Sequence, residues 1–256
     1  LAASAVAVVV AVVVVVTTSA QSSSATLVFS FAPAGTRAPL ILDLHGAGQT
    51  PEMQRVGSGM FYCTRQRRWH VAYPSGVGRT WNAGPGTYAP ASGSAALPAT
   101  DHVGNLSSMA VSLRASLNAS HVFVAGLSNG CAMALRLGLE AEPGVIDGVA
   151  CTGHAMNADI RAREPPEPRP LLLLTGAHDP MFAGDAAIAR TLEEWMFNNG
   201  CNGTLRSSSV TSDLTTSDAN ACGANAVRHV LFHHHGHIVP QHRAAEMQCA
   251  FFERFL

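Results

Sequence analysis

The residues Val122-Phe-Val-Ala-Gly-Leu-Ser-Asn-Gly130 decide the fold, because an apolar run leads directly into a serine framed by two glycines. The run is strand-like, and the segment after it, Cys131 to Leu139, is helix-like. A tight strand-to-helix turn holds a serine in a strained backbone conformation with its Oγ atom exposed. The pattern predicts Ser128 as a nucleophile; a serine in an ordinary turn is the alternative.

Apolar strands and helices alternate on both sides of this turn. Strands are expected at Thr26–Phe31, Leu40–Leu44, Val71–Tyr73, His121–Gly126, Val149–Thr152, Leu171–Thr175 and Val227–His233. Helices are expected at Met53–Gln66, Asp101–Leu117, Asn129–Glu140, Ala186–Asn198 and Ala244–Leu256, with Asp101 near an N-cap. This alternation predicts a mostly parallel sheet with helices on both faces, in a single α/β domain.

A nucleophilic serine needs a base, and the base needs an acid that holds its tautomer. In this type of fold the acid and then the histidine follow the serine along the chain, each after a strand. Asp179 follows the strand ending at Thr175, and His237 follows Gly236 on the turn after the last strand. We therefore expect Asp179 as acid and His237 as base. Asp185 is the second candidate acid, although a helix cap explains it better.

The third requirement is a pair of backbone N–H groups directed at the developing oxyanion. One is expected from Asn129, the residue after the nucleophile. The other is expected from Ala47, because His45-Gly-Ala-Gly48 follows an early strand and its glycines let the Ala47 N–H turn inward.

These pieces resemble a known family, the secreted α/β-hydrolase esterases that include polyhydroxybutyrate depolymerase-like and feruloyl esterase-like enzymes. The matching segments are Leu44-His-Gly-Ala-Gly-Gln-Thr50, Ala72-Tyr-Pro-Ser-Gly76, Arg79-Thr-Trp-Asn-Ala-Gly84, Asp101-His-Val-Gly104, Gly126-Leu-Ser-Asn-Gly130, Thr175-Gly-Ala-His-Asp-Pro180 and Gly236-His237. The resemblance spans about residues 27 to 256. It implies the α/β-hydrolase fold, the same triad and oxyanion donors, an ester substrate and no cofactor.

The sequence departs from this family at three places. The last strand ends in His233-His-His-Gly-His-Ile-Val-Pro240, where the family has a glycine-rich GGGHxWP-like end, so Val239 replaces a tryptophan. Asn105 replaces the aromatic residue of a DDVGF-like segment, and a Cys-Cys pair after the WNAG segment is absent. The aromatic substrate wall therefore differs. Trp81 and Tyr88 are candidates to line the substrate site, and packing is the alternative role for each.

Six cysteines suit an exported protein in which disulfides survive. The resemblance implies a disulfide between Cys201 and Cys222. The pairing of Cys63, Cys131, Cys151 and Cys249 stays open, and Cys131 can also be read as a small buried hydrophobic residue.

Residues 1–20 read as a signal peptide cleaved after Ala20, since the apolar run from Ala5 to Val16 is uncharged and ends in small residues. A permanent membrane anchor is the alternative. A short Ser-rich joint occupies residues 21–26, and the esterase domain covers 27–256. Asn105, Asn118 and Asn202 lie in glycosylation triplets. We expect a secreted protein without stable membrane insertion.

Composition and spacing limit the other functions. Only 13% of residues are charged, the net charge is −1, and the 16 basic residues are all scattered arginines, which argues against nucleic acid as a partner. The histidines from His233 to His237 raise the alternative of a metal site, but no matching carboxylate or cysteine set accompanies them, so we expect no metal. A non-catalytic binding protein on the same fold is the remaining alternative. The substrate is expected to be an ester attached to, or within, an extracellular polymer; the oligomeric state stays open.

Overall fold

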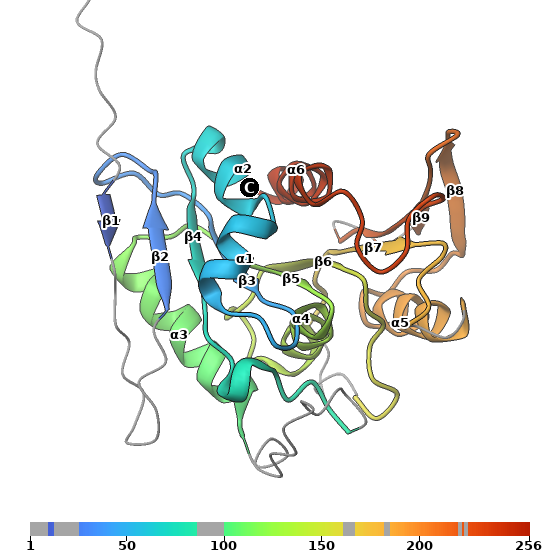
Figure 1. Cartoon of the computed structure of the whole chain (residues 1–256), viewed down its shortest axis with the longest axis horizontal. Coiled ribbons are helices and arrows are strands. Elements are labelled where there is room, and N and C mark those ends of the chain that lie inside the picture. Colours follow the sequence, from blue (N-terminus) through green and yellow to red (C-terminus); the bar gives the residue numbers. More distant parts are fainter. Residues whose placement is uncertain are drawn as a thin grey trace, which may run out of the picture.

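The structure of the protein is a computed structural model of the whole chain (Figure 1). It describes residues 10–12, 26–85, 100–160, 167–181, 185–219, 222 and 225–256. Most of the expected leader and Tyr88 lie outside the described residues. The rest includes every other residue to which the sequence assigned a role in the site.

A ten-stranded sheet forms the centre of the described part of the molecule, in the order β1-β2-β4-β3-β5-β6-β7-β10-β9-β8. Its middle consists of parallel strands: β4 (His70–Tyr73), β3 (Leu40–Leu44), β5 (Val122–Leu127), β6 (Gly148–Thr152), β7 (Leu171–Gly176) and β10 (Val227–Phe232). The antiparallel edges are β2 (Leu27–Ser30) with β1 (Val10–Val12), and β9 (Leu214–Ala219) with β8 (Leu205–Val210). The carboxyl ends of the parallel strands all meet at one edge.

Helices cover both faces of this sheet (Figure 1). One face carries α3 (His102–Ser116), α4 (Asn129–Glu140) and α5 (Asp185–Asn198), and the other carries α1 (Pro51–Gly57), α2 (Met60–Arg67) and α6 (Gln241–Phe252). Within β3, Leu40, Leu42 and Leu44 join the first core and Ile41 joins the second. Because successive strand residues point to opposite faces, a continuous apolar run is required here. The α/β architecture predicted from the sequence is confirmed.

The helix expected from Met53 to Gln66 is two helices. The chain breaks between α1 and α2, where Gly59 adopts φ +81°. A Cβ atom on Gly59 would lie 2.9 Å from the Cα of His242 in α6. The break therefore lets the start of α2 approach α6 closely. This tertiary contact cannot be read from the helical spacing of apolar residues.

The hairpin of β8 and β9 was not predicted. Five of the six β8 residues are exposed, and both strands are rich in Ser and Thr without alternation of apolar and polar residues. The hairpin extends the sheet by backbone pairing with β10 at its edge. Hydrophobic periodicity is the main signal of secondary structure in a sequence, and an exposed edge hairpin without such periodicity is not predicted by it.

Three disulfides connect the six cysteines: Cys63–Cys249, Cys131–Cys151 and Cys201–Cys222. The third is the pair implied by the family resemblance. The second shows that Cys131 is a cross-linked residue and not merely a small hydrophobic one. It joins the first turn of α4 to β6.

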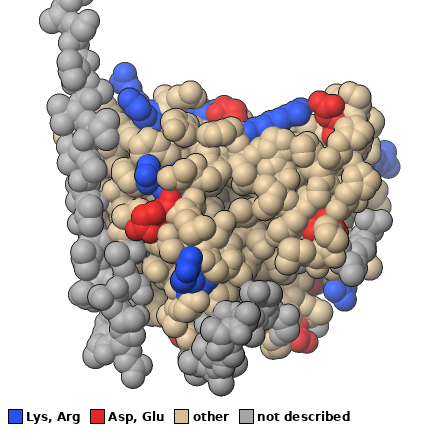
Figure 2. All heavy atoms as spheres, in the orientation of Figure 1, with Lys and Arg blue, Asp and Glu red and all other residues tan. Residues whose placement is uncertain are grey.

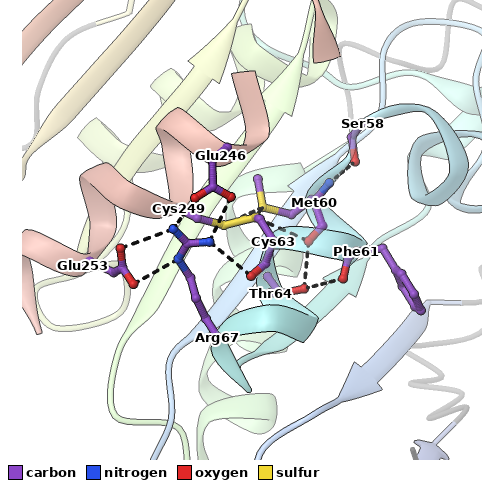
Figure 3. The surroundings of a disulfide bond; sticks show 9 residues. All are labelled: Ser58, Met60, Phe61, Cys63, Thr64, Arg67, Glu246, Cys249 and Glu253. Atoms are coloured by element: carbon purple, nitrogen blue, oxygen red, sulfur yellow. Dashed lines mark hydrogen bonds and ion pairs between the residues drawn. A yellow bond between two sulfur atoms is a disulfide. The ribbon is translucent and has the colours of Figure 1, made fainter. Parts of the chain in front are cut away.

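The Cys63–Cys249 disulfide ties α2 to α6, and an ion cluster lies beside it (Figure 3). Arg67 of α2 donates to Glu246 of α6 at 3.0 Å and forms an ion pair with Glu253 at 3.0 Å. These charge-assisted bonds raise the already high pKa of the Arg67 guanidinium. The disulfide and the ion cluster together hold α6 against α2.

The surface is sparsely charged, as the composition requires. On the face in Figure 2, a few arginines and carboxylates lie singly or in small groups among wide uncharged areas. Among the described residues, no helix has the length and apolarity needed to cross a membrane. Three residues of the expected leader, Val10–Val12, pair with β2.

Candidate active site

Ser128 occupies the turn between β5 and α4, at φ 55° and ψ −122°. A left-handed φ at a residue with a side chain is strained and is held by its surroundings. A Cβ atom on Gly126 would lie 2.5 Å from the Gly130 carbonyl oxygen, and one on Gly130 would lie 2.6 Å from the His45 carbonyl oxygen. Both glycines are therefore required by close backbone approach, and the turn has the geometry of a nucleophile elbow.

Asp179 and His237 are hydrogen-bonded to each other, although 58 residues separate them. The His237 Nδ1 atom lies 2.9 Å from Asp179 Oδ2, and the Met181 amide donates to Asp179 Oδ1 at 2.9 Å. The His237 side chain is 17% exposed, and the Asp179 side chain is 7% exposed. A carboxylate accepts but cannot donate, so Nδ1 carries the proton and Nε2 is the basic nitrogen of the neutral ring.

The segment after β6 lies between the serine turn and the histidine. The Ser128 amide donates to the Thr152 carbonyl at 2.9 Å. A Cβ atom on Gly153, which has φ +73°, would lie 3.0 Å from the His237 carbonyl oxygen and 3.6 Å from its ring. Since β5, β6, β7 and β10 are consecutive neighbours in the sheet, Ser128, Asp179 and His237 lie at one edge around this segment.

The loop that follows β3 is held by its own polar groups. Gly46 N–H donates to Gln49 Oε1 at 2.9 Å, and Gly48 N–H donates to the Arg79 carbonyl at 2.7 Å, with Gly48 at φ +77°. The Ala47 amide has no hydrogen-bond partner within the described ranges. Asn129 is the first residue of α4, and the first N–H groups of a helix have no partner inside it. Both expected oxyanion donors are therefore backbone N–H groups without a partner among the described residues, as binding of a ligand oxygen requires.

His45 fixes this loop through both ring nitrogens. The Gly76 amide donates to His45 Nε2 at 3.0 Å, so Nε2 is an acceptor and Nδ1 carries the proton. Nδ1 lies 2.9 Å from the Gly46 carbonyl oxygen and donates to it. Burial lowers the pKa of His45, and the charge of Arg79 contributes in the same direction. The neutral ring thus sets the orientation of the peptide that precedes Ala47.

Trp81 is 2% exposed, and its ring lies against His45 and His102. This burial favours the packing role over the substrate wall. Tyr88 is outside the described residues, so its role stays a prediction. Val239, which stands where the family has a tryptophan, is also buried, in the core on the α6 side.

His154 is a site neighbour that the sequence reasoning missed. Its Nδ1 atom donates to the Ala155 carbonyl, and burial lowers its pKa, with the nearby His237 ring contributing in the same direction. It follows Thr152 and Gly153 directly. The signal that could have found it is its place just past the carboxyl end of a predicted strand, where this type of sheet collects its functional residues.

The histidines after β10 bond to the neighbouring hairpin. His233 Nε2 lies 2.9 Å from Thr215 Oγ1, and His234 Nε2 lies 3.0 Å from the Ser212 carbonyl oxygen. In the part of the chain that the structure describes, no group of three or more His, Cys, Asp or Glu residues has an arrangement that could hold a metal ion.

Comparisons with known proteins identify the fold. No protein-family model and no curated protein matches the sequence. Among solved structures, the acetyl xylan esterase from Aspergillus awamori aligns with a TM-score of 0.64 at 14% identity, over 88% of this chain and 94% of that one. The carboxylesterase from Bacillus cereus gives 0.61 at 13% identity, over 91% and 95%. The poly(3-hydroxybutyrate) depolymerase LpqC from Bordetella parapertussis gives 0.55 at 13% identity, over 90% and 83%.

These similarities cover nearly the whole chain and define its class. The protein has the α/β-hydrolase fold, as the sequence predicted. At such identities the likeness extends to the fold alone, because one fold can carry many different chemistries.

Proposed function

We propose that this protein is a secreted serine carboxylic ester hydrolase. Ser128 is the nucleophile, His237 the general base, Asp179 the acid that orients it, and the Ala47 and Asn129 amides are the oxyanion donors. The observation that carries the proposal is the His237–Asp179 hydrogen bond of 2.9 Å at the sheet edge where Ser128 sits in a strained turn. This combination supplies a base with a defined tautomer at the same sheet edge as a half-buried serine hydroxyl.

The first half of the reaction forms an acyl-enzyme. His237 Nε2 takes the Ser128 hydroxyl proton while Oγ attacks the ester carbonyl carbon, and Asp179 stabilises the imidazolium that results. The negative oxygen of the tetrahedral intermediate is stabilised by the Ala47 and Asn129 N–H groups. The bond between carbon and the alkoxy oxygen then breaks, and that oxygen takes the proton from His237 Nε2 as the alcohol leaves.

The second half repeats these roles with water. His237 Nε2 takes a proton from a water molecule as its oxygen attacks the acyl carbon. The second tetrahedral intermediate collapses, Ser128 Oγ leaves with the proton from His237, and the carboxylic acid is released. No cofactor takes part in either half.

We further propose that the ester belongs to an extracellular polymer, either a polyhydroxyalkanoate or a polysaccharide with feruloyl or acetyl groups. Support comes from the family resemblance and from two of the similar structures, which are named for the esters of xylan and of poly(3-hydroxybutyrate). The apolar leader, the three disulfides and the exposure of Asn105, Asn118 and Asn202 support export.

A substrate panel tests the proposal. Purified wild type and Ser128→Ala are compared on short nitrophenyl esters, methyl ferulate, acetylated xylan and polyhydroxybutyrate. We expect wild type to hydrolyse the short esters and at least one polymer ester, and Ser128→Ala to lose at least about 10³-fold of the rate. Ester hydrolysis that survives Ser128→Ala would refute the assignment, and no turnover on any ester would favour a binding protein on the same fold.

A further inference from the structure

Asn129, the residue after the proposed nucleophile, has a side chain that is hydrogen-bonded to two consecutive residues, Thr80 and Trp81. Its Oδ1 atom accepts hydrogen bonds from the Trp81 amide at 2.7 Å and from Thr80 Oγ1 at 3.0 Å. Its Nδ2 atom donates to the Trp81 carbonyl at 3.1 Å. Asn129 is 2% exposed. The side-chain amide therefore pairs with Trp81 as a neighbouring backbone would, and fixes the start of α4 to that residue.

The same tryptophan reaches the other oxyanion donor through its indole. Trp81 Nε1 donates to the His45 carbonyl at 2.8 Å, and His45 lies two residues before Ala47. The His45 carbonyl also faces Gly130, since a Cβ atom there would lie 2.6 Å from it. Trp81 thus contacts the Ala47 loop with its side chain and the Asn129 turn with its backbone.

The indole has little room to move. Its ring centroid lies 4.8 Å from that of His45 and 5.3 Å from that of His102, and the ring is buried. The next residue is anchored as well, because the Asn82 amide donates to His102 Nδ1 at 2.9 Å. Buried, hydrogen-bonded groups of this kind hold a single geometry.

We propose that Trp81 is a positioning residue that fixes the relative placement of the two oxyanion donors, Ala47 N–H and Asn129 N–H. The inference rests on the proposed function, because it assigns Trp81 to the stabilisation of the tetrahedral intermediate. Oxyanion donors act only within about 2.7 to 3.1 Å of the developing charge, so a linkage that holds both at once contributes to the rate and not to ground-state binding.

The Trp81→Phe variant tests this directly, because it keeps an aromatic ring and the backbone bonds to Asn129 but loses the Nε1 donor. We expect kcat on a short nitrophenyl ester to fall about 10- to 100-fold with KM unchanged. The affinity of a trifluoromethyl ketone, which forms the tetrahedral oxyanion, should fall by the same factor. The affinity of the carboxylic acid product should not change.

Trp195→Phe is the matched control. Trp195 is 1% exposed in α5, and its indole nitrogen has no hydrogen-bond partner among the residues that the structure describes. It lies outside the proposed site, so the variant should keep wild-type kcat and ketone affinity. A general loss of packing would affect both variants, whereas loss of the linkage affects Trp81→Phe alone.

A second variant keeps the test decisive if Trp81→Phe does not fold. Asn129→Ala retains the backbone N–H of Asn129 and removes the linkage from its other end, so it should give the same loss of kcat and ketone affinity. The double variant should lose no more than either single one, because both changes break one linkage.

Several results would overturn the inference. A raised KM with unchanged kcat in Trp81→Phe would mark Trp81 as a substrate contact. Wild-type kinetics in a folded Trp81→Phe variant would show that the linkage does not affect the rate. Strictly additive losses of kcat in the double variant would show that Trp81 and Asn129 do not act through one linkage. Failure of the proposed function is distinguishable, because hydrolysis would then be unaffected by Ser128→Ala. Hydrolysis that depends on Ser128 but not on Trp81 would refute this inference alone.

Discussion

The imidazole of His237 and the carboxylate of Asp179 lie 2.9 Å apart, and the Met181 amide holds the second carboxylate oxygen. Each carboxylate oxygen thus has one donor, and the ring has one defined tautomer. The bond joins two loops that follow β7 and β10, which are neighbours in the sheet. The sheet itself therefore places the pair, and the loops need only a few residues each to complete it.

Replacement of Asp179 by asparagine tests what this bond contributes. The amide can donate to Nδ1 and so favours the tautomer in which Nε2 carries the proton and cannot act as a base. We expect kcat on a nitrophenyl ester to fall about 10³- to 10⁴-fold with little change in KM. Asp185→Asn, at the start of α5, is the control and should keep the wild-type rate. Equal effects of the two variants would show that Asp179 is not the acid.

The sequence predicted the parts of this arrangement that depend on local pattern. The run from β5 through Ser128 into α4 is continuous in the chain, and its apolar spacing and glycines specify it without tertiary information. Asp179 and His237 were found because each follows a predicted strand. Contacts between distant segments were not foreseen. The hydrogen bonds of Trp81, the position of His154 and the pairing of Cys131 in α4 with Cys151 in β6 all depend on which elements and loops meet in the folded chain. Hydrophobic periodicity carries no information about such long-range contacts.

The Cys131–Cys151 disulfide lies against the serine turn, since Cys131 is three residues after Ser128 and Cys151 pairs in register with Gly126. We expect the double alanine variant to lose about 3 kcal/mol of unfolding free energy in the chain-entropy model, and kcat to fall at least about tenfold because the turn loosens. The measurements are urea denaturation and nitrophenyl ester kinetics.

The Cys201–Cys222 disulfide gives a matched control for that experiment. Its sequence separation is 21, against 20 for Cys131–Cys151. The chain-entropy model therefore assigns both the same loss of stability, about 3 kcal/mol. Only the pair beside Ser128 should lower kcat. A comparable fall in kcat for both double variants would mean that general stability, and not the serine turn, controls the rate.

Asp43 is a buried carboxyl group in β3 whose burial raises its pKa to about 6, an effect that hydrogen bonds from Ser58 and Gln54 only partly offset. The folded protein therefore binds more protons than the unfolded chain between pH 3.8 and about 6, and its stability falls as the pH rises through that window. Asp43→Asn keeps an acceptor for Gln54 and removes the charge.

We expect Asp43→Asn to raise the unfolding free energy at pH 7.5 by up to about 3 kcal/mol, and the gain to vanish near pH 4. Urea denaturation across this range measures it. Asp159→Asn, at an exposed carboxyl group, should show no such trend. A gain that does not depend on pH would assign the effect to packing and not to the charge.

His102 has the opposite pH dependence. It is 4% exposed in α3, and burial, with the charge of Arg136, lowers its pKa to about 4. The unfolded chain, in which the pKa is 6.5, therefore binds more protons between pH 6.5 and about 4, and stability is lost as the pH falls through that window. His102→Asn retains an acceptor for the Asn82 amide and cannot be protonated.

As the pH is lowered from 7.5 to 4, wild type should therefore lose up to about 3 kcal/mol of unfolding free energy relative to His102→Asn. Only wild type has a buried histidine at this position whose protonation the fold disfavours. A difference that stays constant over this range would contradict the assigned cause. Since Asp43 and His102 lie on opposite faces of the sheet and share no partner, their effects should add. The Asp43→Asn variant alone should then lose stability more steeply in acid than wild type does, because the offset from Asp43 protonation is gone while the His102 loss remains.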